Sequence, residues 1–151
     1  MTIHPKTRDL ARRLLEYEAM DAEFPEPIES ATFRVYEKLR QSLSVFAGVT
    51  AFESLASRAL ALSKPEAPGL DAVQIAADGS IRGLDESYPQ TDKDRNRAHD
   101  NEVTERGVIL IARLLGLLLI FLGESLTFSL LQVQWPSAVF DDRNSRNRRN
   151  V

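Results

Sequence analysis

Residues 107–123 read GVILIARLLGLLLIFLG, and Arg113 is the one charged residue among them. Apolar side chains occupy nearly every face of a helix with this sequence, so other elements have to cover it on nearly all sides. The pattern predicts one long helix that begins near Glu102 and runs towards Val133, with its most apolar part between Leu110 and Leu131. This helix is expected to be the centre of the fold.

The segments that precede this helix are expected to cover it. Apolar residues at helical spacing predict three amphipathic helices, which begin near Thr7, Ser30 and Thr50. The apolar residues of the three helices are Leu10, Leu14, Leu15 and Tyr17; Phe33, Tyr36, Leu39, Leu43 and Phe46; and Phe52, Leu55, Ala59 and Leu62. The sequence therefore predicts a mainly α protein, a bundle of about four helices with one long apolar C-terminal helix.

A small β-hairpin is expected near residues 71–84. Val73 and Ile75 alternate with polar or small residues, and Asp78-Gly79 supplies the positive φ angles that a two-residue type I′ turn requires. Pairing across that turn places Leu84 opposite Val73. Because a hairpin of two strands is only marginally stable in water, it is expected to lie on the helices or to pair with a second copy.

Two polar segments fall outside these elements. Residues 85–101, DESYPQTDKDRNRAHDN, contain few apolar side chains and predict a flexible polar loop. Residues 141–151 carry four arginines among asparagines and predict a disordered basic tail. Residues 1–140 have the length of one ordinary domain, so a single helical domain is expected.

A membrane span through residues 107–131 is the first alternative to a helix buried in protein. The uncharged run from Leu114 to Gly123 is shorter than the roughly 20 apolar residues that cross a bilayer. Arg113 and Glu124 flank this run, and a charge at the bilayer centre costs about 2.5–3.5 kcal/mol or more. Burial in protein is therefore favoured, and membrane association is kept as an alternative.

A column of small residues on the long helix marks a candidate interface. Ala112, Gly116, Gly123 and Thr127 fall on one line of a continuous helix. Small side chains let a second helix approach closely, either from the same chain or from a second copy. A large apolar face that the chain itself does not cover favours the second copy.

Two charged residues on the same helix are candidates for buried polar groups. Arg113 and Glu124 are eleven residues apart, nearly three full turns, so they share a face of a continuous helix. If they line an internal pocket, the protein binds a small ligand or is an enzyme. This is a second alternative.

Few residues favour catalysis or metal binding. The chain has no cysteine, which excludes thiolate nucleophiles and thiolate metal sites. His4 and His99 have no second histidine, and no serine with an acid, at a useful spacing. Residues 92–103 begin like a calcium-binding EF-hand loop, but Arg97 and Val103 replace the glycine and the glutamate that the loop needs. No catalytic residue, metal or cofactor is therefore expected.

Three stretches of the chain carry a resemblance to other proteins. They are residues 33–40, residues 55–62 with 72–84, and residues 114–127 with Trp135-Pro136. In these stretches the chain resembles a group of small bacterial helical proteins for which no function is known. The resemblance implies a bacterial, cytosolic protein, and it carries over no activity, cofactor or site residue.

These features together predict a function in protein–protein interaction. We expect a non-enzymatic interaction module that forms a homo-oligomer and docks onto another protein. The net charge of −3 offers no general attraction for nucleic acid. The first residues, MTIHPK, lack the apolar region of a secretory signal, so a cytoplasmic location is expected. The membrane anchor at residues 107–131 and the pocket at Arg113 and Glu124 stay open as alternatives.

Overall fold

A computed structural model of the protein describes residues 5–21, 28–83 and 93–136. Within these ranges the chain is mainly helical, with one small antiparallel sheet, which confirms the predicted class. The helices are α1 (Pro5–Asp21), α2 (Ile28–Ala47), α3 (Val49–Ser63), the 3-10 helix η1 (Pro68–Leu70), α4 (Lys93–Leu122) and α5 (Glu124–Gln134). The strands are β1 (Gln74–Ile75) and β2 (Ile81–Arg82).

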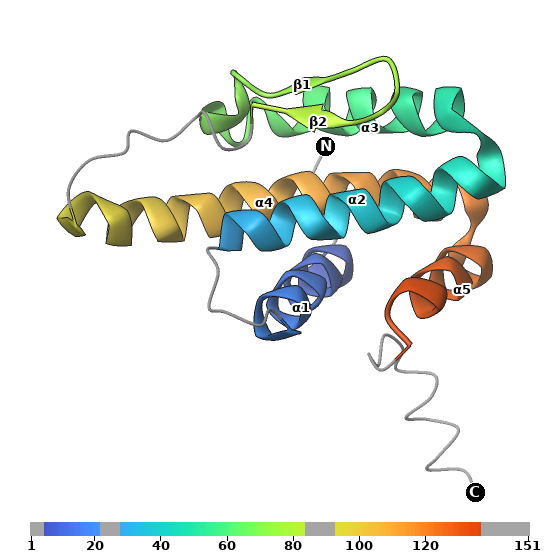
Figure 1. Ribbon diagram of the computed structural model, residues 1–151, viewed down its shortest axis with the longest axis horizontal. Coiled ribbons are helices and arrows are strands. Elements are labelled where there is room, and N and C mark those ends of the chain that lie inside the picture. The colour runs from blue at the N-terminus through green and yellow to red at the C-terminus, as the bar shows by residue number, and fades with distance from the viewer. Residues whose placement is uncertain (1–4, 22–27, 84–92, 137–151) are drawn as a thin grey trace, which may run out of the picture.

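The helices form three layers around α4. α2 and α4 run side by side along the long axis of the molecule (Figure 1). α3 and the hairpin lie on one side of this pair, and α1 and α5 lie on the other side. α4 packs against α1, α2, α3 and α5, so it is the central helix of the described part of the chain.

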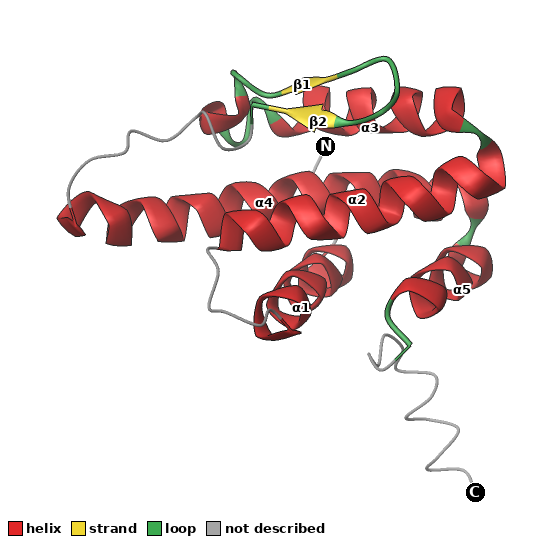
Figure 2. Cartoon of the chain, in the orientation of Figure 1, coloured by secondary structure: helices red, strands yellow, loops and turns green. Residues whose placement is uncertain are grey.

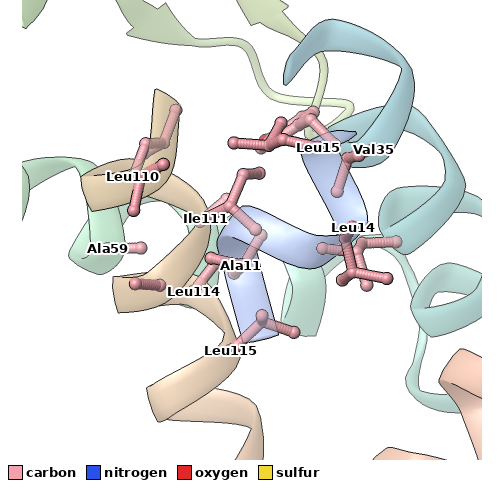
Figure 3. Packing of buried hydrophobic residues seen from close by; sticks show 14 of the residues in the cluster. Ala11, Leu14, Leu15, Val35, Ala59, Leu110, Ile111, Leu114 and Leu115 are labelled. Carbon is pink, nitrogen blue, oxygen red and sulfur yellow. The ribbon is translucent and has the colours of Figure 1, made fainter. Parts of the chain in front are cut away.

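The middle of α4 is buried on every face. Every residue from Arg106 to Leu115 is buried, which a single neighbouring helix could not achieve. Figure 3 shows the side chains that meet there: Ala11, Leu14 and Leu15 from α1, Val35 from α2, Ala59 from α3, and Leu110, Ile111, Leu114 and Leu115 from α4. Each fully buried leucine or isoleucine stabilises the fold by about 1.5–3 kcal/mol relative to an exposed one.

The long C-terminal helix is interrupted, contrary to the prediction of one helix from Leu110 to Leu131. α4 ends at Leu122, and α5 begins at Glu124 after a single loop residue (Figure 2). Gly123 between them has φ 87° and ψ 166°, a backbone conformation that is essentially restricted to glycine. Periodicity alone could not locate this break, because the apolar pattern continues on both sides of it.

The same helix begins earlier than expected. α4 starts at Lys93, so residues 93–101 are helical and the prediction of a flexible loop over 85–101 is wrong for them. The sequence from Lys93 to Arg106 contains no glycine or proline that would end a helix. A polar composition by itself does not distinguish a helix from a loop. Residues 85–92 and the predicted tail at 141–151 lie outside the described residues.

The hairpin forms near its predicted place but with a different turn. Ile75 pairs with Ile81, and the amide of Gly79 donates to the carbonyl of Ala76 at 2.8 Å. The loop therefore has three residues and ends in Gly79, at φ 85°, rather than the two residues expected. Adding one loop residue shifts the register of β2 by one, so Ile81 rather than Arg82 lies opposite Ile75, while Val73 and Ile75 keep the inward face that was predicted for them. Leu84, the predicted partner of Val73, lies outside the described residues.

The turn of the hairpin is fastened to α2. The hydroxyl of Tyr36 donates a hydrogen bond of 2.6 Å to the carbonyl of Gly79, and its ring meets Phe52 edge-on with centroids 5.4 Å apart. Arg40 Nε donates to the carbonyl of Asp78 at 3.2 Å. Burial, and then the negative charge of Glu37, raises the pKa of Tyr36 well above its ordinary value, so this hydroxyl stays a donor. The hairpin therefore lies on the helices.

Two glycines of α4 provide a matched test of how closely its neighbours approach. A Cβ added at Gly107 would lie 2.3 Å from Oγ1 of the buried Thr32, whereas one added at Gly116 would have its nearest neighbour, Thr7 Cγ2, at 4.0 Å. We expect Gly107→Ala to lower the free energy of unfolding by about 1–3 kcal/mol through overpacking. Gly116→Ala should leave it unchanged or raise it by up to about 1 kcal/mol, because alanine favours helix. Urea unfolding of both variants measures this, and equal effects would contradict the close packing of α2 on α4.

Candidate functional site

The four small residues of the predicted interface do not form one column. Ala112 is buried in α4, and Gly116 is followed along the chain by Gly123, at which the helix ends. Thr127 belongs to α5, is buried, and donates a hydrogen bond of 3.2 Å to the carbonyl of Leu118. Because the chain turns at Gly123, residues on its two sides no longer share a helix face. The contact that faces Gly116 is Thr7 of α1, in the same chain.

Arg113 and Glu124 are also separated by this turn. Arg113 is buried, and its guanidinium contacts both carboxylate oxygens of Glu66, with Nη2–Oε1 at 2.5 Å and Nε–Oε2 at 3.3 Å. Glu66 lies in the turn between α3 and η1. Glu124 is exposed at the first turn of α5, so the expectation that it is buried with Arg113 is wrong. The structure therefore gives Arg113 a partner other than the one predicted, and it does not bury Glu124.

The ion pair of Arg113 with Glu66 has a structural explanation. A planar guanidinium that meets both carboxylate oxygens is the arrangement preferred for buried arginine. The pair ties the end of α3 to the centre of α4. In the part of the chain that the structure describes, no three histidine, aspartate or glutamate side chains gather in a way that could hold a metal ion.

A polar cluster that the sequence did not indicate lies where α1, α2 and the end of α5 meet. At its centre is Glu18 of α1, which is only 2% exposed. Its Oε1 accepts from Arg34 Nε at 3.2 Å, and its Oε2 accepts from Lys38 Nζ at 2.5 Å and from Trp135 Nε1 at 2.8 Å. We call Glu18, Arg34, Lys38 and Trp135 the Glu18 cluster.

Further contacts make the Glu18 cluster a junction of three helices. Arg34 Nη2 also donates to the backbone carbonyl of Glu18 at 2.9 Å. The ammonium of Lys38 lies 5.4 Å from the centre of the Trp135 ring, within the range of a cation–π interaction. Beside it, Gln134 Nε2 donates to Ser42 Oγ at 2.6 Å. These contacts fix the end of α5 against α2.

The charge of Glu18 is stabilised within this cluster. Burial by itself would raise the pKa of the carboxyl group, but hydrogen bonds from Lys38 and Trp135, the charge of Lys38 and the hydrogen bond from Arg34 outweigh it. The pKa of Glu18 is therefore below its ordinary value, and the group is a carboxylate at neutral pH. Arg34, Lys38 and the indole N–H of Trp135 donate to both carboxylate oxygens of Glu18. These ion pairs and hydrogen bonds give the carboxylate a structural role.

A second feature is an uncovered apolar surface at one end of the molecule. In the described part of the chain, seven large apolar residues are exposed, and five of them lie in the two corners α2–α3 and α4–α5. These five are Val45, Phe46, Val49, Ile120 and Phe121, and we call them the apolar end. Both corners lie at the same end of the long axis (Figure 1).

The chain leading into each corner of the apolar end carries no charge, and an exposed carboxylate, Glu124, follows directly after the second corner. Residues 41–52, which include the first corner, contain no charged residue, and neither do residues 114–123 before the second corner. Val45 is 89% exposed and Ile120 is 77% exposed, so these side chains are almost fully in water. Sequence periodicity assigns Phe46 to the buried stripe of its helix, but Phe46 lies in the last turn of α2 and is 52% exposed.

Comparisons of the chain with protein-family models, with curated proteins and with solved structures found no match. The resemblance to small bacterial proteins therefore stays a prediction. Among the described helices, none is both long and apolar enough to cross a membrane.

The contribution of the Glu18 cluster can be measured by removing its charge. We expect Glu18→Gln to lower the free energy of unfolding at pH 7 by about 1–3 kcal/mol, because Arg34 and Lys38 then lose their counter-charge in a partly buried site. Glu16→Gln is the matched control, since Glu16 is exposed on the same helix, and its effect should stay within about 0.5 kcal/mol. Denaturant unfolding of both variants tests this, and equal losses would refute it.

The same cluster predicts a dependence on pH. A carboxyl group whose pKa is lowered by folding stabilises the protein fully above its ordinary pKa of 4.5, and this stabilisation is lost as the pH falls through the lowered value. The difference in unfolding free energy between the natural chain and Glu18→Gln should therefore shrink below pH 4.5. Unfolding curves recorded from pH 7 downwards measure it. A difference that is constant with pH would contradict the assigned ionisation of Glu18.

Proposed function

We propose that the protein is a non-enzymatic interaction module that self-associates through the apolar end. The observation that carries this proposal is the gathering of Val45, Phe46, Val49, Ile120 and Phe121 at one end of the molecule. Single exposed apolar residues are common on soluble proteins, but several large ones at one place are typical of an interaction surface.

Hydrophobic burial supplies the driving force for such a contact. Each Å² of apolar surface removed from water contributes roughly 25 cal/mol, and aromatic side chains such as Phe46 and Phe121 expose the largest areas. Aromatic residues at the centre of an interface also tend to dominate its binding energy. We therefore place these two phenylalanines at the centre of the contact.

The uncharged stretches that lead into the apolar end favour a second copy as the partner. In a two-fold contact each surface meets itself, so a charged surface would bring like charges together. The uncharged sequences 41–52 and 114–123 avoid this repulsion. The cytoplasm of a bacterium, which the resemblance implies, is the setting we propose.

Association with a membrane surface is a weaker candidate. Peripheral proteins that insert apolar side chains into a bilayer usually place lysines and arginines beside them, which attract anionic lipids. Neither uncharged sequence supplies such a residue, and the net charge of the chain is −3. The chemistry of the apolar end therefore supports contact with protein rather than with lipid.

The proposal predicts that polar substitutions at the apolar end weaken self-association. Phe46→Ser combined with Phe121→Ser should raise the dissociation constant of the dimer by roughly tenfold or more, because both side chains are more than half exposed in the single chain and buried in the contact. Sedimentation velocity over a wide concentration range measures this constant. Such exposed positions leave the stability of the monomer nearly unchanged.

Phe33→Ser is the matched control for the double variant. Phe33 is 43% exposed on the same helix as Phe46 but about 20 Å further along it, at a rise of about 1.5 Å per residue. We expect it to leave the dissociation constant unchanged. The proposal fails if the natural chain is a monomer at every concentration, or if the control weakens association as much as the double variant does.

A further inference from the structure

A single residue, Gly123, interrupts what would otherwise be one continuous helix made of α4 and α5. The amide of Gly123 still donates to the carbonyl of Leu119 at 2.9 Å, which is the last helical hydrogen bond of α4. Its carbonyl accepts from the amide of Thr127 at 3.1 Å, which is the first helical hydrogen bond of α5. Only the φ and ψ angles of Gly123 therefore have to change for the two helices to join.

The sequence around this glycine favours the joined form. Residues 114–134 contain no proline and are rich in leucine, which has a high helix propensity. Helical periodicity continues across Gly123, which is why the sequence alone predicts one helix there. Gly123 permits the turn, and the docking of α5 stabilises it.

The docking of α5 is small and specific. Its buried side chains are Thr127 and Leu131, followed by Trp135 at the residue after the helix. α5 packs against α2 and α4, and Trp135 reaches Glu18 of α1. A helix of 11 residues is marginal by itself in water, so α5 depends on this receptor surface.

We propose that α5 is exchanged between two copies of this chain. In the exchanged dimer Gly123 has helical angles, α4 and α5 form one helix, and Trp135 of the partner subunit donates to Glu18. Each receptor surface then holds the same helix with the same contacts, so exchange loses no packing or hydrogen bond of α5. The inference rests on the proposed self-association and adds how the two copies are joined.

The exposed residues beside the turn support a second copy as the occupant. Ile120 and Phe121 lie in the last turn of α4, directly before Gly123, and both are more than half exposed. In the exchanged dimer the two joined helices pass each other at this point. The surface that is uncovered in the single chain is therefore the surface at which the second copy arrives.

Gly123→Ala tests the exchange. A Cβ at Gly123 would meet nothing within 4 Å, so the substitution acts only through the backbone. Alanine disfavours the turned conformation at φ 87° and favours the joined helix. We expect the dissociation constant of the dimer to fall by roughly tenfold to a hundredfold relative to the natural chain.

Gly48→Ala is the matched control. Gly48 joins α2 and α3 at φ 97° and ψ 156°, and a Cβ there would also meet nothing within 4 Å. The strain introduced is the same, but α3 is held by five buried residues, including Phe52 and Leu60. We expect this variant to be less stable without dimerising more strongly. Equal dimerisation of the two variants would overturn the exchange.

Cross-linking identifies which copy supplies α5. The chain has no cysteine, so Ser42→Cys with Gln134→Cys places a unique pair of thiols beside each other on α2 and α5. The pair is introduced into the Gly123→Ala chain, the dimer is isolated, and a short bismaleimide joins the thiols. Exchange predicts that two chains stay linked on a denaturing gel.

The remaining outcomes separate the exchange from self-association. A dimer whose cross-links lie within single chains would overturn the exchange and leave association through the apolar end intact. If both the natural chain and Gly123→Ala are monomers at every concentration, the exchange and the proposed function fail together.

Discussion

The need to cover the middle of α4 organises the whole molecule. Ten consecutive residues, from Arg106 to Leu115, are buried, so this segment requires neighbours in every direction. α1, α2 and α3 supply them, and the two arginines of the segment are anchored by the α3–η1 region, where Arg113 meets Glu66 and Arg106 donates to the carbonyl of Gly69. The cover ends before the last turn of α4, and this is why Ile120 and Phe121 are exposed.

The sequence predicts the helices well because their apolar stripes follow local geometry. Leu10, Leu14, Leu39, Leu43 and Phe52 are buried as their spacing indicated. The same spacing assigned Phe33 and Phe46 to buried stripes, and both are exposed. Periodicity identifies one face of a helix, but whether a neighbour extends far enough to cover each end of that face is decided by the packing of the whole chain.

The polar contacts of Glu18 and Arg113 could not be predicted from the sequence, because they also depend on the packing of the whole chain. Rules for charged pairs relate residues three or four apart on one helix, whereas Glu18 meets Trp135 across 117 residues and Arg113 meets Glu66 across 47. The prediction that Arg113 and Glu124 share a face assumed a helix that continues through Gly123. Because glycine can adopt either the helical or the turned conformation, the sequence near Gly123 did not show whether the helix breaks there.

Gly123 is therefore a point at which local preference and tertiary contacts disagree. The residues around it favour a continuous helix, whereas the contact of Trp135 with Glu18 within one chain requires the turn. Natural sequences usually make local and global preferences agree, and exceptions are expected where a protein changes its contacts.

The buried carboxylate of Glu18 is suited to recognising the end of α5, because a charge-assisted hydrogen bond is directional and accepts only a donor at the right place. Apolar packing alone would hold α5 with less discrimination, since leucines tolerate many arrangements. The cluster thus specifies which helix end docks beside α1 and α2, and Gly123 leaves open from which copy it comes.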